Sequence, residues 1–223
     1  MYIEQSHKKG PFVEWLGEHP QKDGWGPINP THKFIFVHIP KTAGISIATA
    51  LDLACTQCHS PAHEIKRILN KTEFGKIIWQ NYFKFSFVRN PWSWVISNLF
   101  FHANFFNIPI DPSTFLTDWM TNGKINTTNK FTARISQIMN TGQYGFLSKE
   151  ETLLVDFVGK FENLQQDFDY ICNELGVPQT ILLHKNKTRE YKHYTEYYNE
   201  DTKQFIATKF ARDIKYFGYT FEG

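Results

Sequence analysis

The amino-acid sequence predicts an α/β fold in which a mainly parallel central sheet is flanked by helices. Three short apolar runs have the composition of buried strands, namely residues 34–39, 83–88 and 153–158. Each run is followed by a turn and by apolar residues at helical spacing, and strands that alternate with helices favour a parallel sheet. In this chain of 223 residues we expect a single domain over residues 33–223, preceded by an irregular arm over residues 1–32.

The composition is that of a globular protein. Hydrophobic residues make up 41% of the chain, aromatic residues 17%, and the formal net charge is +2. These values exclude a disordered chain, and so small a net charge predicts no general binding of nucleic acid. We expect no membrane partner, because no apolar run reaches the roughly 18 residues of a bilayer-spanning helix. The N-terminus lacks the apolar stretch of a secretory signal, which favours a cytoplasmic location, with a luminal domain cut from a longer chain as the alternative.

The turn after the first strand is rich in groups that bind anions. Lys41 supplies a positive charge, and Thr42 and Ser46 supply hydroxyl donors. Gly44 leaves room for a phosphate to approach the backbone, and the helix that follows presents its first N–H groups. The turn therefore predicts a phosphate-binding loop, and a buried strand-to-helix turn whose lysine meets solvent is the alternative.

The order of these residues differs from that of the standard nucleotide loop. That loop reads G-x-x-x-x-G-K-[ST], whereas Lys41 and Thr42 here precede a single glycine, Gly44. The run from His38 to Ser46 instead resembles the 5′-phosphosulfate loop of sulfotransferases, which use 3′-phosphoadenosine 5′-phosphosulfate (PAPS) as donor. The resemblance implies that Lys41 is catalytic and that six residues bind the donor: Lys41, Thr42, Ala43, Gly44, Ile45 and Ser46.

A second strand–turn–helix unit follows. Arg89 comes at the carboxyl end of the second strand, where open α/β sheets bind ligands and where a guanidinium can hold a phosphate. Asn90 and Pro91 predict the start of the next helix, and Ser97 lies two turns along it. The run from Arg89 to Ser97 resembles the 3′-phosphate site of sulfotransferases, which implies that Arg89 and Ser97 bind the donor.

Further helices are predicted over residues 64–69 and 73–81, in pieces over 112–138, and over 163–175 and 201–216. Asn163 and Gln166 resemble a capping box at the start of the fourth of these, and Gly176 ends it. The basic loop at residues 185–192 is expected either to fold over the nucleotide or to be solvated.

Over about residues 34–221 the chain resembles the carbohydrate-type sulfotransferases, especially their compact bacterial members. Three further segments carry it, at residues 158–164, 192–198 and 216–219. It implies a P-loop-like fold, PAPS as donor, 3′-phosphoadenosine 5′-phosphate (PAP) as product and no metal. It also implies in-line transfer to a hydroxyl acceptor, a carbohydrate or another small molecule. Cys58 stands where relatives often carry a basic residue, which puts acceptor preference in doubt.

The same resemblance implies a histidine base shortly after the first helix, and His59 occupies that position. An imidazole has an ordinary pKa of about 6.5, so much of it is neutral at physiological pH, as a base must be. His63 is the second candidate, and His38 is expected to point from its strand into neighbouring structure.

The same residues also allow other functions. A nucleotide kinase on the same scaffold lacks support because the G-K-[ST] order is absent, and a non-catalytic binder of nucleotides or glycans is a further alternative. The run Cys55-Thr-Gln-Cys58-His59 matches the pattern of covalent haem attachment, but no export signal accompanies it. A zinc site using His59 or His63 is equally weak, and a chance pair of small buried thiols explains the cysteines better.

Overall fold

The computed structural model of the protein describes residues 26–53, 59–182 and 192–223. Within them, a four-stranded sheet has the order β1-β2-β3-β6. The strands are β1 (Ile28–Asn29), β2 (Phe34–Val37), β3 (Phe83–Val88) and β6 (Phe157–Lys160). Strands β2, β3 and β6 are parallel, and β1 is antiparallel to β2. The predicted α/β class with a mainly parallel sheet is confirmed.

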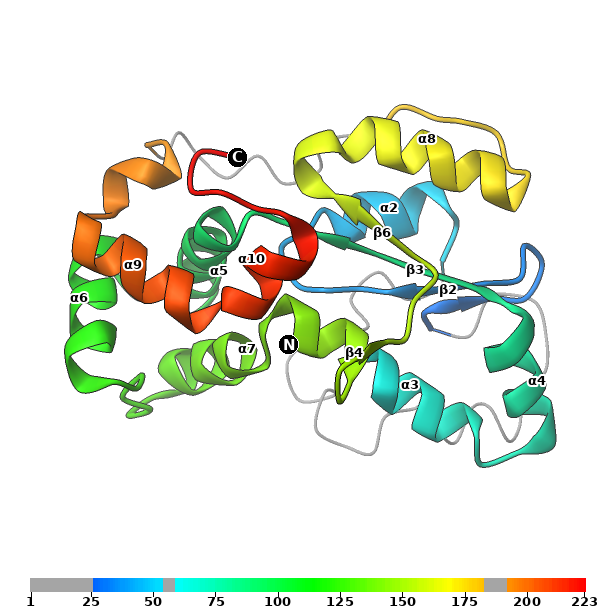
Figure 1. Cartoon of the computed structure of the whole chain (residues 1–223), viewed down its shortest axis with the longest axis horizontal. Coiled ribbons are helices and arrows are strands. Elements are labelled where there is room, and N and C mark those ends of the chain that lie inside the picture. Colours follow the sequence, from blue (N-terminus) through cyan, green and yellow to red (C-terminus); the bar gives the residue numbers. More distant parts are fainter. Residues whose placement is uncertain (1–25, 54–58, 183–191) are drawn as a thin grey trace.

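Helices cover both faces of this sheet (Figure 1). On one face lie α2 (Gly44–Ala50) and α8 (Leu164–Leu175), and on the other lie α3 (Ala62–Leu69) and α4 (Glu73–Asn81). Beside the sheet, four helices gather around α5 (Pro91–Phe105): α6 (Pro112–Asn122), α7 (Lys130–Leu147), α9 (Glu200–Lys209) and α10 (Ala211–Phe217). Two 3₁₀ turns are also present, η2 (Phe161–Asn163) and η3 (Tyr194–Tyr197).

The sequence of β2 shows why both faces are covered. Phe34 and Phe36 pack with α2 and α8, whereas Ile35 and Val37 pack on the opposite side with residues of α3 such as Ile65. Alternate side chains of a strand point to opposite faces, so a strand that is apolar at every position must be buried on both. This burial fixes the ends of β2 and β3, from which the two predicted anion-binding turns emerge.

The single strand predicted over residues 153–158 is wrong. The segment divides into β5 (Thr152–Leu153), which pairs with β4 (Ser148–Lys149) in a separate hairpin, and β6, which enters the main sheet. The cause lies at Asp156. Its carboxylate accepts a hydrogen bond from the backbone N–H of Lys84 (2.8 Å) and lies 3.0 Å from the Lys84 ammonium, so the polar residue aligns β6 with β3.

Three other boundaries also differ from expectation. The predicted capping box at Asn163 is wrong, because its side chain makes no capping hydrogen bond and the turn η2 leads into α8 instead. The closing helix is two helices, α9 and α10, which are divided at Phe210. Ile28 and Asn29 belong to the sheet, so the predicted irregular arm does not extend through residue 32.

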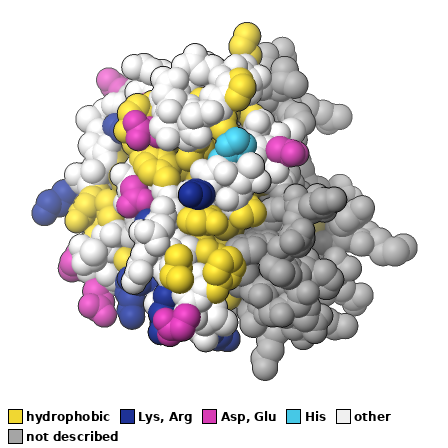
Figure 2. All heavy atoms as spheres, turned by 90° about the vertical axis from the view of Figure 1, so that its right-hand side faces the viewer, with side chains coloured by type: hydrophobic (Ala, Val, Ile, Leu, Met, Phe, Trp, Pro, Cys, Tyr) yellow, Lys and Arg dark blue, Asp and Glu magenta, His cyan; other side chains and the backbone are white. Residues whose placement is uncertain are grey.

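Figure 2 shows the surface of the molecule at the end where α4 lies. Acidic and basic side chains are intermixed there, and hydrophobic side chains lie between them. In the described part of the chain, none of the helices combines the length and apolar composition that a bilayer crossing requires.

Candidate functional site

The turn after β2 has a constrained backbone. Lys41 and Ala43 adopt positive φ angles of 66° and 65° although neither is glycine. Such conformations are disfavoured for residues with a Cβ, and they persist where the surrounding structure holds them. The turn is therefore shaped by its surroundings rather than by the preferences of its own residues.

Two hydrogen bonds hold this turn in place. The Trp94 indole, from α5, donates to the Pro40 carbonyl at 2.7 Å. The Thr42 hydroxyl donates to the Ile39 carbonyl at 2.9 Å, and Thr42 is fully buried. In this structure the Thr42 hydroxyl therefore closes the turn.

Gly44, the first residue of α2, faces a histidine. A Cβ at this position would lie 1.9 Å from Nε2 of His38, so only glycine lets the imidazole pack there. His38 is buried and its ring stacks on Phe36, as expected for a residue that points into neighbouring structure. The structure thus gives a reason for Gly44 that differs from the predicted approach of a phosphate.

Arg89 lies at the carboxyl end of β3, next to the turn after β2. Its Nε donates to the Ser93 hydroxyl at 2.9 Å, and its Nη1 lies 3.5 Å from the Lys41 carbonyl oxygen. The guanidinium also covers the ring of Phe161, 4.3 Å from the centroid. Burial lowers the pKa of Arg89 to about 10, and the charge of Glu162 opposes this shift. The structure therefore brings the two predicted anion-binding turns together.

Lys41 completes this pair of cations. Its ammonium lies 4.0 Å from the centroid of the Phe101 ring, on α5. Burial, and then the charge of Arg89, lowers the pKa of Lys41 to about 8. Arg89 thus disfavours the protonation of Lys41, and a bound anion would be strongly attracted to the two neighbouring cations.

Gln143 fixes the position of Arg89 through its main chain. Its amide oxygen accepts from the Arg89 N–H at 2.8 Å, and its amide nitrogen donates to the Arg89 carbonyl at 2.7 Å. Glu162 acts similarly one residue later, because its carboxylate accepts from the Asn90 N–H at 2.8 Å and from the Tyr219 hydroxyl at 2.9 Å. Sequence reasoning found neither Gln143 nor Glu162 in these roles, although Glu162 and its partner Tyr219 lie in segments that carry the family resemblance.

The two serines predicted to bind the donor lie on different helices. Ser97 is partly exposed on α5, one turn beyond Ser93, and Ser93 is the one that bonds Arg89. Ser46 lies in the first turn of α2, after Ala43 and Ile45. It also lines a pocket of about 410 Å³ between α2 and the segment after α8.

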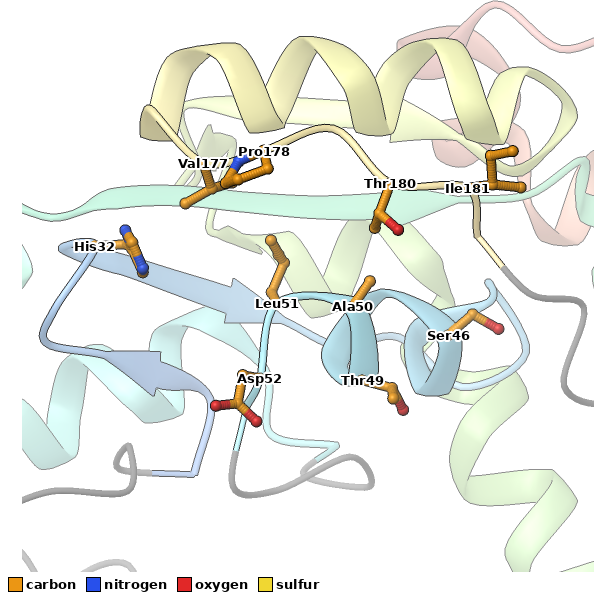
Figure 3. A pocket seen from close by; sticks show the side chains of 10 residues that line it. All are labelled: His32, Ser46, Thr49, Ala50, Leu51, Asp52, Val177, Pro178, Thr180 and Ile181. Atoms are coloured by element: carbon orange, nitrogen blue, oxygen red, sulfur yellow. The ribbon is translucent and has the colours of Figure 1, made fainter.

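This pocket extends along α2 away from the constrained turn (Figure 3). Ser46 lies at one end, and His32 and Asp52 lie at the other. Thr180 and Ile181 line it from the segment that follows α8. Of the described residues, Ser46 is in the pocket lining, whereas Lys41, Arg89 and His59 are not.

His59 is held close to the same turn. Its Nδ1 lies 3.2 Å from the His38 carbonyl oxygen, and its ring meets the His38 ring edge to face, with centroids 4.2 Å apart. Because a carbonyl only accepts, the contact places the proton on Nδ1 and leaves a lone pair on Nε2. Burial, with smaller contributions from the charges of Arg134 and Lys41, lowers the pKa of His59 to about 4, and the hydrogen bond to His38 opposes this shift. A neutral imidazole with an available Nε2 has the form that a base requires.

His102, on α5, is a second buried histidine in this neighbourhood. Its Nδ1 lies 2.9 Å from the Asn98 carbonyl oxygen, and burial lowers its pKa to about 4. The charges of Arg134, Lys41 and His59 contribute to the shift. Sequence reasoning missed both His102 and Arg134, because nothing in their helical spacing separates them from ordinary helix residues.

The remaining candidates from the sequence are His63, the cysteines, the basic loop and the residues of a metal site. His63 lies in the first turn of α3, and within the described residues no contact joins it to Lys41. Cys55 and Cys58, on which the haem alternative depends, lie outside the described residues, as do residues 185–191 of the basic loop. Among the residues that the structure describes, no three His, Cys, Asp or Glu side chains are grouped so as to hold a metal ion.

Comparison with known proteins bears directly on this site. The model of the sulfotransferase family matches residues 27–220, which include both turns and His59. The chain belongs to the sulfotransferase family. It is also 26% identical over 114 residues to an uncharacterized protein of Archaeoglobus fulgidus, an alignment that covers 50% of this chain and 82% of that protein. No solved structure matches the chain.

Membership in this family assigns the general activity, sulfotransfer, to the chain. The matched region contains every described strand of the central sheet, together with Lys41, His59, Arg89 and His102.

Proposed function

We propose that this sulfotransferase transfers the sulfuryl group of PAPS to a carbohydrate hydroxyl, with His59 as general base. One observation carries the proposal: the Arg89 guanidinium lies 3.5 Å from the Lys41 carbonyl, so the two anion-binding turns adjoin. A nucleotide with phosphate groups at both its 3′ and 5′ positions needs two such cationic sites within its own length.

The two turns divide the donor between them. Lys41, with the amides and side chains of residues 42–46, binds the 5′-phosphosulfate, and Arg89 with Ser97 binds the 3′-phosphate. In the described part of the chain neither Lys41 nor Arg89 takes part in an ion pair with a carboxylate. Both cations are therefore available to the donor, and bidentate hydrogen bonds from arginine suit a phosphate well.

The chemistry follows from where charge develops. An acceptor oxygen forms a bond to sulfur while the bond from sulfur to the 5′-phosphate oxygen breaks, and PAP leaves. Negative charge then grows on the sulfuryl oxygens and on the leaving phosphate. Lys41 and the N–H groups at the start of α2 stabilise that charge, because preorganised donors act most strongly where charge appears in the transition state.

His59 removes the proton of the attacking hydroxyl. The hydrogen bond from Nδ1–H to the His38 carbonyl orients the ring and leaves the Nε2 lone pair for the acceptor. The low pKa keeps the imidazole neutral at physiological pH. A positioned base of this kind contributes about 10²–10⁴-fold to a rate.

The test is sulfate transfer from labelled PAPS to a panel of glycosides. His59→Ala should lower kcat by about 10²–10⁴-fold while PAP affinity stays unchanged. His63→Ala is the matched control and should keep its activity, because His63 lies on α3 without a contact to Lys41. Undiminished turnover by His59→Ala, or a larger loss in His63→Ala, would remove His59 from the role of base.

A further inference from the structure

The first turn of α5 contacts both of the turns proposed to hold the donor. Ser93 and Trp94 follow each other there. The Ser93 hydroxyl accepts from Nε of Arg89 at 2.9 Å. The Trp94 indole donates to the Pro40 carbonyl at 2.7 Å. Two consecutive residues of one helix therefore hold the arginine that follows β3 and the turn that follows β2.

Trp94 is a rigid point of attachment for the turn after β2. Its side chain is fully buried, and its ring meets the Phe210 ring edge to face, with centroids 5.7 Å apart. The Pro40 carbonyl, which accepts from the indole, immediately precedes Lys41, whose φ of 66° is held by the surroundings of the turn. Because the indole is packed tightly and has a single donor, its hydrogen bond fixes where this turn lies relative to α5.

Ser93 fixes the direction in which the Arg89 side chain points. Ser93 is buried, and its hydroxyl bonds Nε, the guanidinium nitrogen nearest the aliphatic chain. The other two nitrogens of the planar group then keep a set orientation, with Nη1 3.5 Å from the Lys41 carbonyl oxygen. The main chain of Arg89 is held separately by Gln143, so Ser93 contributes the orientation of the fork that would meet a phosphate.

A nucleotide bisphosphate needs its two cationic sites at one separation. The ribose sets the distance between the 3′- and 5′-phosphates, so both phosphates can bind at once only where the protein holds its two sites at a matching distance. A misplacement of about 1 Å can cost about 10²-fold. Ser93 and Trp94 are neighbours in one hydrogen-bonded helical turn, which keeps their two contacts at a nearly constant distance.

We propose that Ser93 and Trp94 are positioning residues that set the separation between the Arg89 guanidinium and the Lys41 turn. They thereby select a nucleotide whose phosphates are at the 3′ and 5′ positions. The proposal rests on the proposed function and adds to it the residues that determine the spacing of the two phosphate sites. Ser93 acts through Arg89, and Trp94 acts through the main chain of the turn.

The test compares two ligands of equal charge. PAP and adenosine 2′,5′-bisphosphate carry the same two phosphate groups and differ in which ribose carbon bears the second one. Calorimetric titration of the wild type should show PAP bound about 10- to 100-fold more tightly than the 2′,5′ isomer. A partial loss of folded protein lowers the number of binding sites and leaves this ratio of affinities unchanged.

Each variant removes one of the two hydrogen bonds. Ser93→Ala and Trp94→Phe should each lower the ratio by about 3- to 10-fold, the effect of one hydrogen bond, because the freed group can adjust to either isomer. Ser93→Thr keeps the hydroxyl and should retain most of the ratio.

Trp92→Phe is the matched control for Trp94→Phe. Trp92 is also buried in the first turn of α5, and its indole donates to the Lys203 carbonyl, on α9, at 3.0 Å. The substitution therefore deletes the same kind of bond without touching either donor turn, and Trp92→Phe should keep the wild-type ratio.

The possible results separate this proposal from the proposed function. An unchanged ratio in Ser93→Ala or in folded Trp94→Phe, or an equal fall in Trp92→Phe, would overturn the positioning roles and leave PAPS as the donor. Equal affinity of the wild type for the two isomers would overturn them as well. If thermal unfolding shows that Trp94→Phe does not fold, Ser93→Ala decides. A wild type that does not bind PAP would instead contradict the proposed donor itself.

Discussion

Lys41 is a cation in a place that disfavours its charge. Burial and the neighbouring Arg89 lower its pKa to about 8, while the Phe101 ring beneath it gives partial compensation. His59 is displaced in the same direction, and its pKa falls to about 4. A site that keeps its lysine protonated and its histidine neutral has both groups in the working form between these two values.

The pH profile of the reaction should show this window. For the ligand-free enzyme, kcat/KM should rise through about pH 4, as His59 loses its proton, and fall through about pH 8, as Lys41 loses its own. The measurement is kcat/KM for the donor across pH 3.5–10. An acid limb near 6.5 would mean that His59 is not buried as described.

Two variants show which residue causes each limb of the pH profile. His59→Ala should lose the acid limb along with most of the rate. Lys41→Arg should move the alkaline limb to higher pH, because a guanidinium stays protonated where the lysine does not. An alkaline limb that stays in place in Lys41→Arg would assign it to another group.

At the scale of elements, a kink in α7 connects α10 to Arg89 and so to the proposed donor site. Gly142 has φ 64° and ψ 172° inside the helix, which glycine tolerates. The kink turns the N–H groups of Gln143 and Tyr144 towards the Asp213 carboxylate, at 2.9 and 2.8 Å. The side chain of Gln143 then holds the main chain of Arg89. The position of Arg89 thus depends on α10, which follows Arg89 by more than a hundred residues in the chain.

Gln143→Ala should therefore weaken the binding of PAP although Gln143 does not bind it. Loss of both hydrogen bonds to Arg89 should raise the Kd of PAP by about 10-fold and cost about 1–3 kcal/mol of stability. Gln143→Glu should be intermediate, since it still accepts from the Arg89 N–H but no longer donates to the carbonyl. Calorimetric titration and thermal unfolding measure the two effects.

The control for this element is Gln204→Ala, an exposed position on α9. It should change neither quantity. A PAP affinity in Gln143→Ala equal to that of Gln204→Ala would show that Arg89 needs no support from α7.

Asp213, which joins α10 to the kink in α7, should make the free energy of unfolding depend on pH. Burial raises the pKa of this carboxyl from 3.8 to about 6. A folded-state pKa above the unfolded one means that the folded form binds the proton more tightly. The stabilising contribution is therefore fully present below about pH 3.8 and is lost as pH rises through about 6. Its size is on the order of 3 kcal/mol, at about 1.4 kcal/mol per unit.

Denaturant unfolding of the wild type and of Asp213→Asn from pH 4 to 7 tests this. The difference in the free energy of unfolding, wild type minus variant, should fall as pH rises, because the asparagine does not titrate. A difference that increases with pH would show that the two backbone N–H groups dominate and hold the carboxyl ionised.

At the scale of the whole molecule, local patterns predicted the elements that carry the two turns. The apolar runs of β2 and β3 and the Asn90–Pro91 helix start depend on neighbours in sequence, and all were found where expected. Gly176 ends α8 as predicted, and the structure shows it in the left-handed conformation. These features need no knowledge of the rest of the fold.

The features that sequence reasoning missed depend on distant residues. Asp156 divides the predicted third strand through its contacts with Lys84, 72 positions earlier. Gln143 acts on Arg89 across 54 positions. Side-chain pairing over such separations leaves no periodic signal in the sequence. The roles proposed for the individual donor-binding residues stay predictions.

The central claim is that the turns after β2 and β3 hold opposite ends of one nucleotide. The most direct measurement is the affinity for PAP and for AMP, which differ only in the 3′-phosphate, in the wild type and in Arg89→Ala and Lys41→Ala. The wild type should bind PAP about 10- to 100-fold more tightly than AMP. Arg89→Ala should remove that preference, whereas Lys41→Ala should weaken both ligands and keep it. A preference for PAP that survives in Arg89→Ala would contradict the account.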